Sequence, residues 1–104
     1  MYRDFNARNI DRVLSHLCED VDWPNSLEGG RVLGREAVRV YWTRQFGMLD
    51  PKVEPVGFDG ESEDQITVHI HQVVHDLMGG LVVDQMVDHV YRFRQGLIER
   101  MDIR

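Results

Sequence analysis

The sequence has a single cysteine, Cys18, so no disulfide bond can form within the chain. A chain without disulfides suits a reducing compartment, and we expect a cytoplasmic protein. Cys18 lies near the end of an apolar periodic segment, where a small core residue is expected rather than a nucleophile. The charged and apolar residues that mix at the N-terminus do not predict a signal peptide.

Lysine is equally scarce, since Lys52 is the only one, and the arginines are scattered among carboxylates. The formal net charge is −6. A surface with this balance repels phosphate backbones and anionic lipids, so neither nucleic acid nor membrane is an expected partner. Long hydrophobic runs are also missing, because none approaches the roughly 20 residues of a membrane-spanning helix.

What the sequence does contain is a globular composition, with 42% hydrophobic and 29% charged residues in 104 positions. This much hydrophobicity argues against disorder. The length predicts one domain covering residues 1–104. A chain this short builds a thin core, which a partner subunit would reinforce.

Apolar residues recur with helical spacing in the first half of the chain. The stripes run through Tyr2 and Phe5, then Ile10, Val13, Leu14 and Leu17, then Ala37, Val38, Tyr41, Trp42 and Phe46. We expect Asn9 to cap the second helix and Gly47 to end the third.

The second half changes to β-branched runs separated by turn residues. A short strand is predicted at 21–23, and further strands at 52–59, 65–77, 81–94 and 97–103, with turns at 60–64, 79–80 and 95–96. Helices followed by an antiparallel meander predict an α+β fold with the helices on one face of a curved sheet. Such a sheet and its helical cover enclose a cavity suited to small molecules.

Several segments match one family in order and spacing, although each is weak alone. They are residues 5–11, 17–23, 34–38, 90–93 and 96–98. Together they resemble the SnoaL-like, nuclear transport factor 2-like superfamily, which includes polyketide cyclases and ketosteroid isomerases. The resemblance implies a cone-shaped curved antiparallel sheet packed on N-terminal helices around a pocket, the cystatin-like arrangement.

The resemblance also assigns individual positions. Asn25 falls where ketosteroid isomerases have a general-base carboxylate, and an amide cannot abstract a proton. His89 falls where they have the protonated acid of an oxyanion hole, and histidine can donate a hydrogen bond or shuttle a proton there. Their oxyanion-hole tyrosine falls at Met1, and we expect the adjacent Tyr2 to point elsewhere. A ketosteroid-isomerase mechanism is therefore not expected, since fold does not fix function.

The turn at 79–80 allows the pocket face to be predicted. A two-residue turn places His89 opposite Ile70 and Val87 opposite Gln72. Side chains alternate along a strand. Val68, Ile70, Gln72 and Val74 therefore share a face with Val87, His89 and Tyr91, and the resemblance makes that face concave.

The predicted ligand-contact residues are Trp23, Asn25, Trp42, Ile70, Gln72, Val87, Tyr91 and Met101, with His89 as the candidate catalytic group. Each has a structural alternative. His89 and Gln72 are equally compatible with polar groups satisfied inside the sheet, Asn25 with a turn residue, and the tryptophans with core packing. Met101 and Ile103 are expected to complete the apolar lining.

His69, His71 and His75 share the opposite, convex face of their strand. Alternate histidines can bind a metal, but no carboxylate or cysteine at metal-site spacing completes the set. An exposed or interface strand is the stronger interpretation. Val73 lies on the same face, and the family often dimerises through its sheet, so we expect a homodimer.

Two functions remain open. In the first, the pocket binds a small, largely apolar molecule and acts as an isomerase, cyclase or hydrolase through His89. In the second, the same fold is a non-catalytic ligand-binding or dimerisation module. No metal or organic cofactor is implied. An open cavity with His89 exposed to it would favour the first, and a cavity filled by Trp23, Trp42 or Tyr91 the second.

Overall fold

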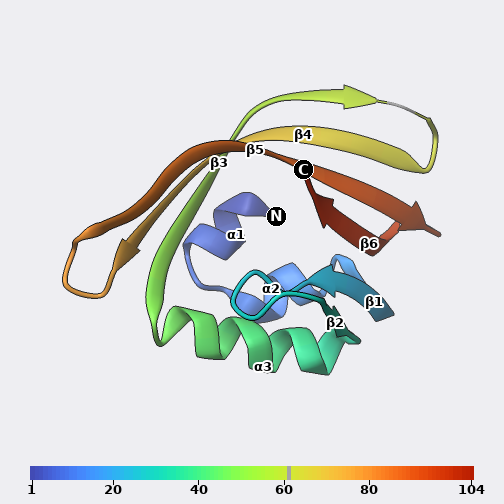
Figure 1. The fold of residues 1–104 in the computed structure, drawn as a ribbon. Coiled ribbons are helices and arrows are strands. Elements are labelled where there is room, and N and C mark those ends of the chain that lie inside the picture. The colour runs from blue at the N-terminus through green and yellow to red at the C-terminus, as the bar shows by residue number, and fades with distance from the viewer. Residues whose placement is uncertain (61) are drawn as a thin grey trace.

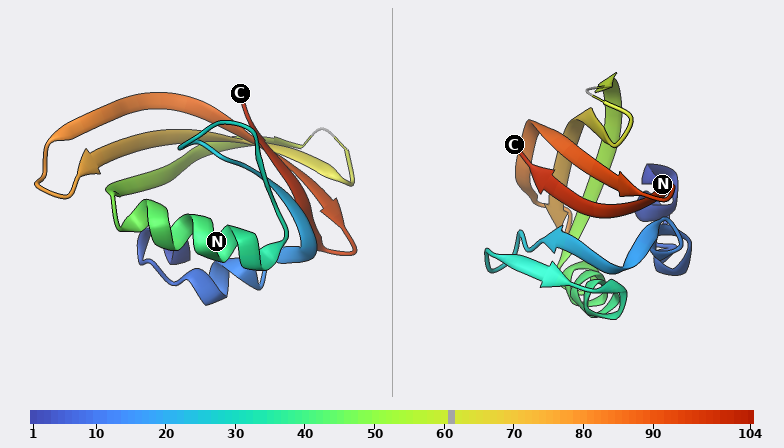
Figure 2. Two further views of the ribbon diagram at one scale, coloured as in Figure 1. Left: turned by 60° about the horizontal axis from the view of Figure 1, so that its bottom comes forward. Right: turned by 90° about the vertical axis from the view of Figure 1, so that its right-hand side faces the viewer.

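The computed structural model describes residues 1–60 and 62–104, and it has the α+β fold that the sequence predicts. The elements in chain order are α1 (Tyr2–Asn6), α2 (Ile10–Leu14), β1 (Leu17–Pro24), β2 (Arg31–Leu33), α3 (Arg35–Phe46), β3 (Leu49–Gly60), β4 (Gln65–Asp76), β5 (Leu81–Arg94) and β6 (Leu97–Ile103). The described strands form one sheet in the order β2-β1-β6-β5-β4-β3. This sheet arches over the helices, and the N-terminus lies beneath the arch (Figures 1 and 2).

The three predicted helices are present, with one boundary moved. The Asn9 side chain caps α2 as expected, accepting from the Arg12 backbone N–H. The helix ends at Leu14, and at its C-cap the Ser15 hydroxyl donates to the Arg12 carbonyl, 2.6 Å away. Leu17, predicted as helical, is the first residue of β1. Gly47 ends α3 as predicted. No helix in the described part of the chain is long and apolar enough to cross a membrane.

β1 and β3 are longer than the sequence pattern indicated, whereas β5 and β6 have the predicted bounds and β4 ends one residue earlier than predicted. β3 begins at Leu49 and contains Pro51 and Pro55, which it tolerates because it is an edge strand paired only with β4. β1 spans eight residues rather than three and runs parallel to β6, so the sheet is not a pure antiparallel meander. The short β2 was not predicted. Of the predicted turn at 60–64, residue 61 lies outside the described residues.

The β4–β5 hairpin has a different register from the one predicted. His89 lies opposite Val68, and Val87 lies opposite Ile70. The prediction that a two-residue turn sets His89 against Ile70 is wrong, because the Asp76 carboxylate accepts from the backbone N–H groups of Met78 and Gly80 and holds a longer turn. The shift amounts to two residues, so every side chain keeps its predicted face.

The core lies between the helices and the β1–β6–β5 part of the sheet. Trp23 from β1 and Trp42 from α3 meet edge to face, with ring centroids 5.3 Å apart. Phe5 from α1 packs edge-on against Trp42 at 5.7 Å. These aromatic rings connect the helical layer to the sheet and form the walls of a hollow on the concave side.

Candidate functional site

The concave face of the sheet and the helices enclose a pocket with a free volume of about 60 Å³. Its lining comes from every helix and from all strands except β2. The lining residues are Met1, Tyr2, Phe5, Val13, Trp23, Pro24, Ser26, Tyr41, Trp42, Gln45, Pro51, Val53, Gln72, His89, Tyr91, Met101 and Ile103. Among these described residues there is no Asp, Glu, Lys, Arg or Cys, so the pocket is apolar with a few neutral polar groups.

His89 lies in a hydrogen-bonded cluster with two tyrosines. The Tyr2 hydroxyl lies 3.1 Å from His89 Nδ1 and 2.6 Å from the Tyr91 hydroxyl. The Tyr91 hydroxyl is 3.5 Å from the same nitrogen. The expectation that Tyr2 points elsewhere is wrong, because α1 lies under the arch and directs Tyr2 at β5. Tyr2 is thus a site residue that sequence reasoning missed.

Burial dominates the ionisation of this cluster. His89 is only 6% exposed, and desolvation lowers its pKa to about 4, against a small opposing effect of Asp88. Desolvation also raises the pKa values of Tyr2 and Tyr91. All three groups are therefore neutral at pH 7. His89 Nε2 has no hydrogen-bond partner among the described residues and is not a fully buried atom.

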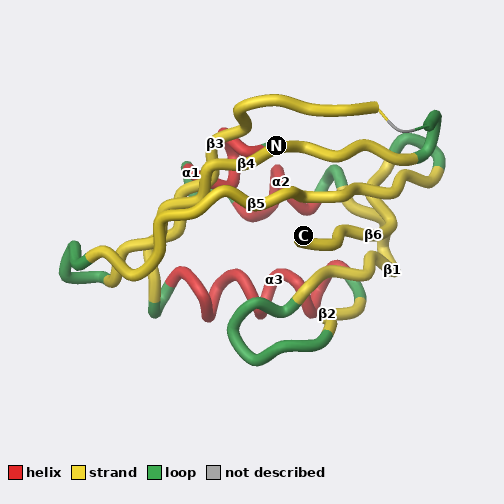
Figure 3. The backbone as a smooth tube through the Cα atoms, turned by 45° about the horizontal axis from the view of Figure 1, so that its top comes forward, coloured by secondary structure: helices red, strands yellow, loops and turns green. Residues whose placement is uncertain are grey.

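A second polar pair lines the pocket where the β1–β2 loop lies beside α3 (Figure 3). The Tyr41 hydroxyl accepts from the Ser26 backbone N–H at 3.0 Å and lies 2.7 Å from the Ser26 hydroxyl. Ser26 is exposed and Tyr41 is buried, which places the pair at the opening of the pocket. Sequence reasoning missed both residues, although Ser26 directly follows the predicted Asn25.

Five of the eight predicted ligand-contact residues line the pocket: Trp23, Trp42, Gln72, Tyr91 and Met101. The Gln72 side-chain oxygen accepts from Gln85 at 3.0 Å, which leaves its own amide N–H groups for the pocket. Ile70 and Val87 lie on the predicted face but outside the lining, and Ile70 is fully buried in packing.

Asn25 is outside the lining as well. Its side-chain oxygen accepts from the backbone N–H groups of Leu27 and Glu28 at 3.1 and 2.9 Å. This is the turn role that the sequence left open, and it fixes the loop that presents Ser26.

The convex face carries the three histidines as predicted. His69 lies between Asp88, 2.7 Å from Nδ1, and Asp59, 2.9 Å from Nε2. His71 Nε2 lies 2.7 Å from Asp84. Among the described residues, no group of three potential ligands is arranged to hold a metal ion.

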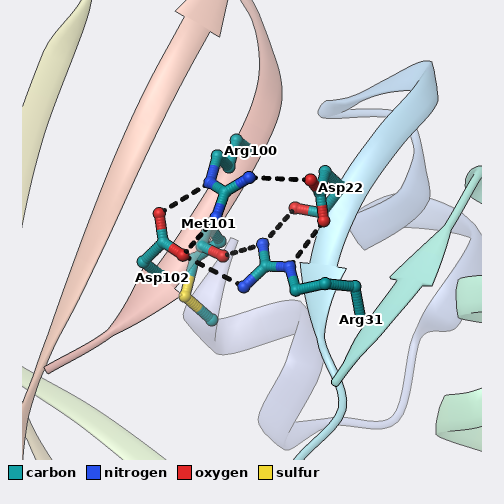
Figure 4. Close-up of polar contacts among 5 residues, drawn as sticks. All are labelled: Asp22, Arg31, Arg100, Met101 and Asp102. Atoms are coloured by element: carbon teal, nitrogen blue, oxygen red, sulfur yellow. Dashed lines mark hydrogen bonds and ion pairs between the residues drawn. The ribbon is translucent and has the colours of Figure 1, made fainter.

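A four-residue ionic network supports the pocket wall from outside (Figure 4). Arg31 of β2 and Arg100 of β6 both bind the Asp22 carboxylate of β1, at 2.6 and 2.8 Å. Both also bind Asp102. Arg31 donates in addition to the Met101 carbonyl at 2.6 Å. The network ties β2, β1 and β6 together behind Trp23 and Met101, the inward-facing neighbours of these residues.

An arched sheet over N-terminal helices around one aromatic pocket is the architecture of nuclear transport factor 2-like proteins, and similar solved structures have it. Residues 1–101 match the family model of the SnoaL-like domain, and the chain belongs to this family. The comparison with curated proteins finds no match.

Three similar structures illustrate the relationship. A nuclear transport factor 2-like protein of unknown function from Burkholderia pseudomallei has a TM-score of 0.85 at 24% identity, covering 99% of this chain and 82% of that one. TerC, co-crystallised with polyporic acid, has a TM-score of 0.85 at 25% identity, covering 99% and 83%. A Mycobacterium tuberculosis protein in complex with estradiol-17β-hemisuccinate has a TM-score of 0.82 at 20% identity, covering 96% and 83%.

Proposed function

We propose that this protein binds a small, largely apolar molecule in the concave pocket, with His89 Nε2–H donating a hydrogen bond to an oxygen of the ligand. The observation that carries the proposal is the hydrogen-bonded cluster around His89 Nδ1. A phenol is a better donor than a neutral imidazole, and imidazole nitrogen is a good acceptor. The favoured arrangement is therefore a chain in which Tyr91 donates to Tyr2 and Tyr2 donates to Nδ1, which leaves the imidazole proton on Nε2.

The ligands of two similar proteins support this proposal. TerC was crystallised with polyporic acid, and the M. tuberculosis protein with a steroid derivative. The free volume of about 60 Å³ is small beside the ~300–1,000 Å³ of typical ligand pockets. Side chains of the lining must therefore move apart when a ring-sized molecule enters, and the cavity is neither plugged nor wide open.

Binding without catalysis is the better supported of the two functions. With a pKa of about 4, His89 is a neutral imidazole at pH 7 and therefore a poor general acid. The described lining offers no carboxylate base and no cysteine nucleophile. An isomerase, cyclase or hydrolase would have to use the neutral His89 alone, through the tautomer with a free Nε2 lone pair.

Paired substitutions at His89 test the proposal. In His89→Asn the amide keeps an acceptor near Nδ1 for Tyr2 but has nothing at Nε2, whereas His89→Gln places an amide at Nε2. With 2-acetylnaphthalene as the probe, calorimetry should show about tenfold weaker binding by His89→Asn, and a smaller loss by His89→Gln. Equal affinity of wild type and His89→Asn would show that the donor is elsewhere.

We further propose a cytoplasmic homodimer that associates through the convex face. His71 and Val73 of β4 lie there with Met86 of β5, which is 60% exposed. A mixed apolar and imidazole face of this kind can meet its own copy across a two-fold axis. Sedimentation equilibrium of wild type and Met86→Asp tests the dimer, since a buried carboxylate would dissociate it.

A further inference from the structure

The Ser26–Tyr41 pair forms a second polar end of the pocket, separate from the His89 cluster. The pair is built from the β1–β2 loop and α3, whereas the His89 cluster is built from α1 and β5. The described residues show no hydrogen bond between the two groups. Trp23 packs against Tyr91 of the His89 cluster at 6.5 Å and against Trp42, which follows Tyr41 on α3, at 5.3 Å.

Counting protons shows that this second end offers a donor. The Tyr41 oxygen already accepts the Ser26 backbone N–H, and one of the two hydroxyls must donate to the other. If Ser26 donates to Tyr41, the Tyr41 proton is free, and if Tyr41 donates, the Ser26 proton is free. In either arrangement one O–H group has no partner within the pair.

The loop that carries Ser26 is held firmly. Besides the two hydrogen bonds to its side chain, Asn25 donates its backbone N–H to the Gly30 carbonyl at 3.0 Å and accepts from Gly29 at 2.9 Å. Glu28 forms an ion pair with Arg44 of α3. A donor on a loop fixed at both ends is preorganised for a ligand.

We propose that the pocket selects apolar ring molecules that carry hydrogen-bond acceptors at both ends. This inference rests on the proposed function. One acceptor binds His89 Nε2–H, and the other binds the free O–H group of Ser26–Tyr41. The apolar body of the ligand lies against Trp23 and Trp42. A molecule with one acceptor leaves one of these donors without a partner, and binding is weaker for that reason.

Two matched ketones test the second end in the wild-type protein. 2-Acetylnaphthalene has one carbonyl group, and 2,6-diacetylnaphthalene has one at each end. Calorimetry should give the diketone an affinity about fivefold higher or more, beyond the roughly twofold that two equivalent ends contribute by statistics. The double variant Ser26→Ala/Tyr41→Phe should reduce this advantage to about twofold. Each single variant should keep it, because the remaining hydroxyl is then free.

The outcomes separate this inference from the proposed function. A wild-type advantage of no more than about twofold overturns the second end, and weaker binding of both ketones by His89→Asn would then leave the proposed function standing. If the double variant keeps the full advantage, the donor is not the Ser26–Tyr41 pair. If neither ketone binds wild type, both proposals fail. Because the two ketones are compared on the wild-type protein, that comparison does not depend on whether any variant folds.

Discussion

The two faces of the β4–β5 hairpin carry histidines with opposite behaviour. On the concave face, His89 is buried between two tyrosines, and desolvation lowers its pKa to about 4. On the convex face, His69 lies at solvent between Asp88 and Asp59, and hydrogen bonds to these carboxylates raise its pKa. The sheet is one element, so the difference comes from the partners and the water on each side. The concave face therefore favours a neutral hydrogen-bond donor, and the convex face favours a charged imidazole.

The largest expected effect is a loss of folding stability in acid, caused by the low pKa of the buried His89. It would sharpen the comparison of the two faces. The pKa of His89 is 6.5 when unfolded and about 4 when folded. Between these values the unfolded chain binds the extra proton, so stability falls as the pH drops from 6.5 to 4 and levels off below. The loss should reach roughly 3 kcal/mol, which urea unfolding at pH 7, 5.5 and 4 measures.

The control for this loss is His89→Asn, which keeps an acceptor for Tyr2 but does not titrate. Its stability should depend less steeply on pH in the same window. An unchanged slope would mean that other groups cause the acid sensitivity of the protein.

A smaller effect is expected from the ionic network behind the pocket. Asp22→Asn removes the carboxylate that Arg31 and Arg100 share, and its side chain is 27% exposed. We expect a cost of about 1 kcal/mol, because partly exposed ion pairs contribute little beyond their hydrogen bonds. Asp20→Asn is the matched control, since Arg94 is the one ion-pair partner of Asp20 among the described residues and the pair lies at the surface. Equal urea midpoints for both variants would contradict a role of the network.

The smallest effect concerns His69. Its raised pKa means that the Asp88 and Asp59 contacts stabilise the fold below pH 6.5, and that this stabilisation is lost as the pH rises through the raised value. NMR titration should place the His69 midpoint above 6.5 in wild type and lower in Asp88→Asn. His89 should titrate below 6.5 in both proteins. Coinciding midpoints for the two histidines would remove the contrast between the faces.

Alternation along β4 and β5 predicted that His89 and His69 lie on opposite faces, and the family resemblance identified the His89 face as the concave one. His89 is concave and His69 convex as predicted, even though the hairpin register was wrong. The register depended on the Asp76 side chain, which closes a longer turn than the two glycines indicated. The fold was predictable because apolar spacing determines which faces are buried.

Tyr2 and the Ser26–Tyr41 pair were harder to predict. The direction of Tyr2 depends on where α1 lies beneath the sheet, and that is decided by contacts distant in sequence. Asn6 of α1, for example, exchanges two hydrogen bonds with the Val53 backbone of β3. The pairing of Ser26 with Tyr41 likewise requires the loop to close against α3. Sequence patterns report local periodicity and carry no signal for these tertiary contacts.

The observed hairpin register has a consequence for how this chain can change in length. A loss or gain of two residues at the β4–β5 turn leaves every pocket side chain facing inward. A change of one residue at the start of β5 would instead turn both His89 and Tyr91 away from the pocket and bring the Asp88 carboxylate into its apolar lining, where nothing compensates its charge. Insertions and deletions in relatives with this pocket should therefore come in even steps here.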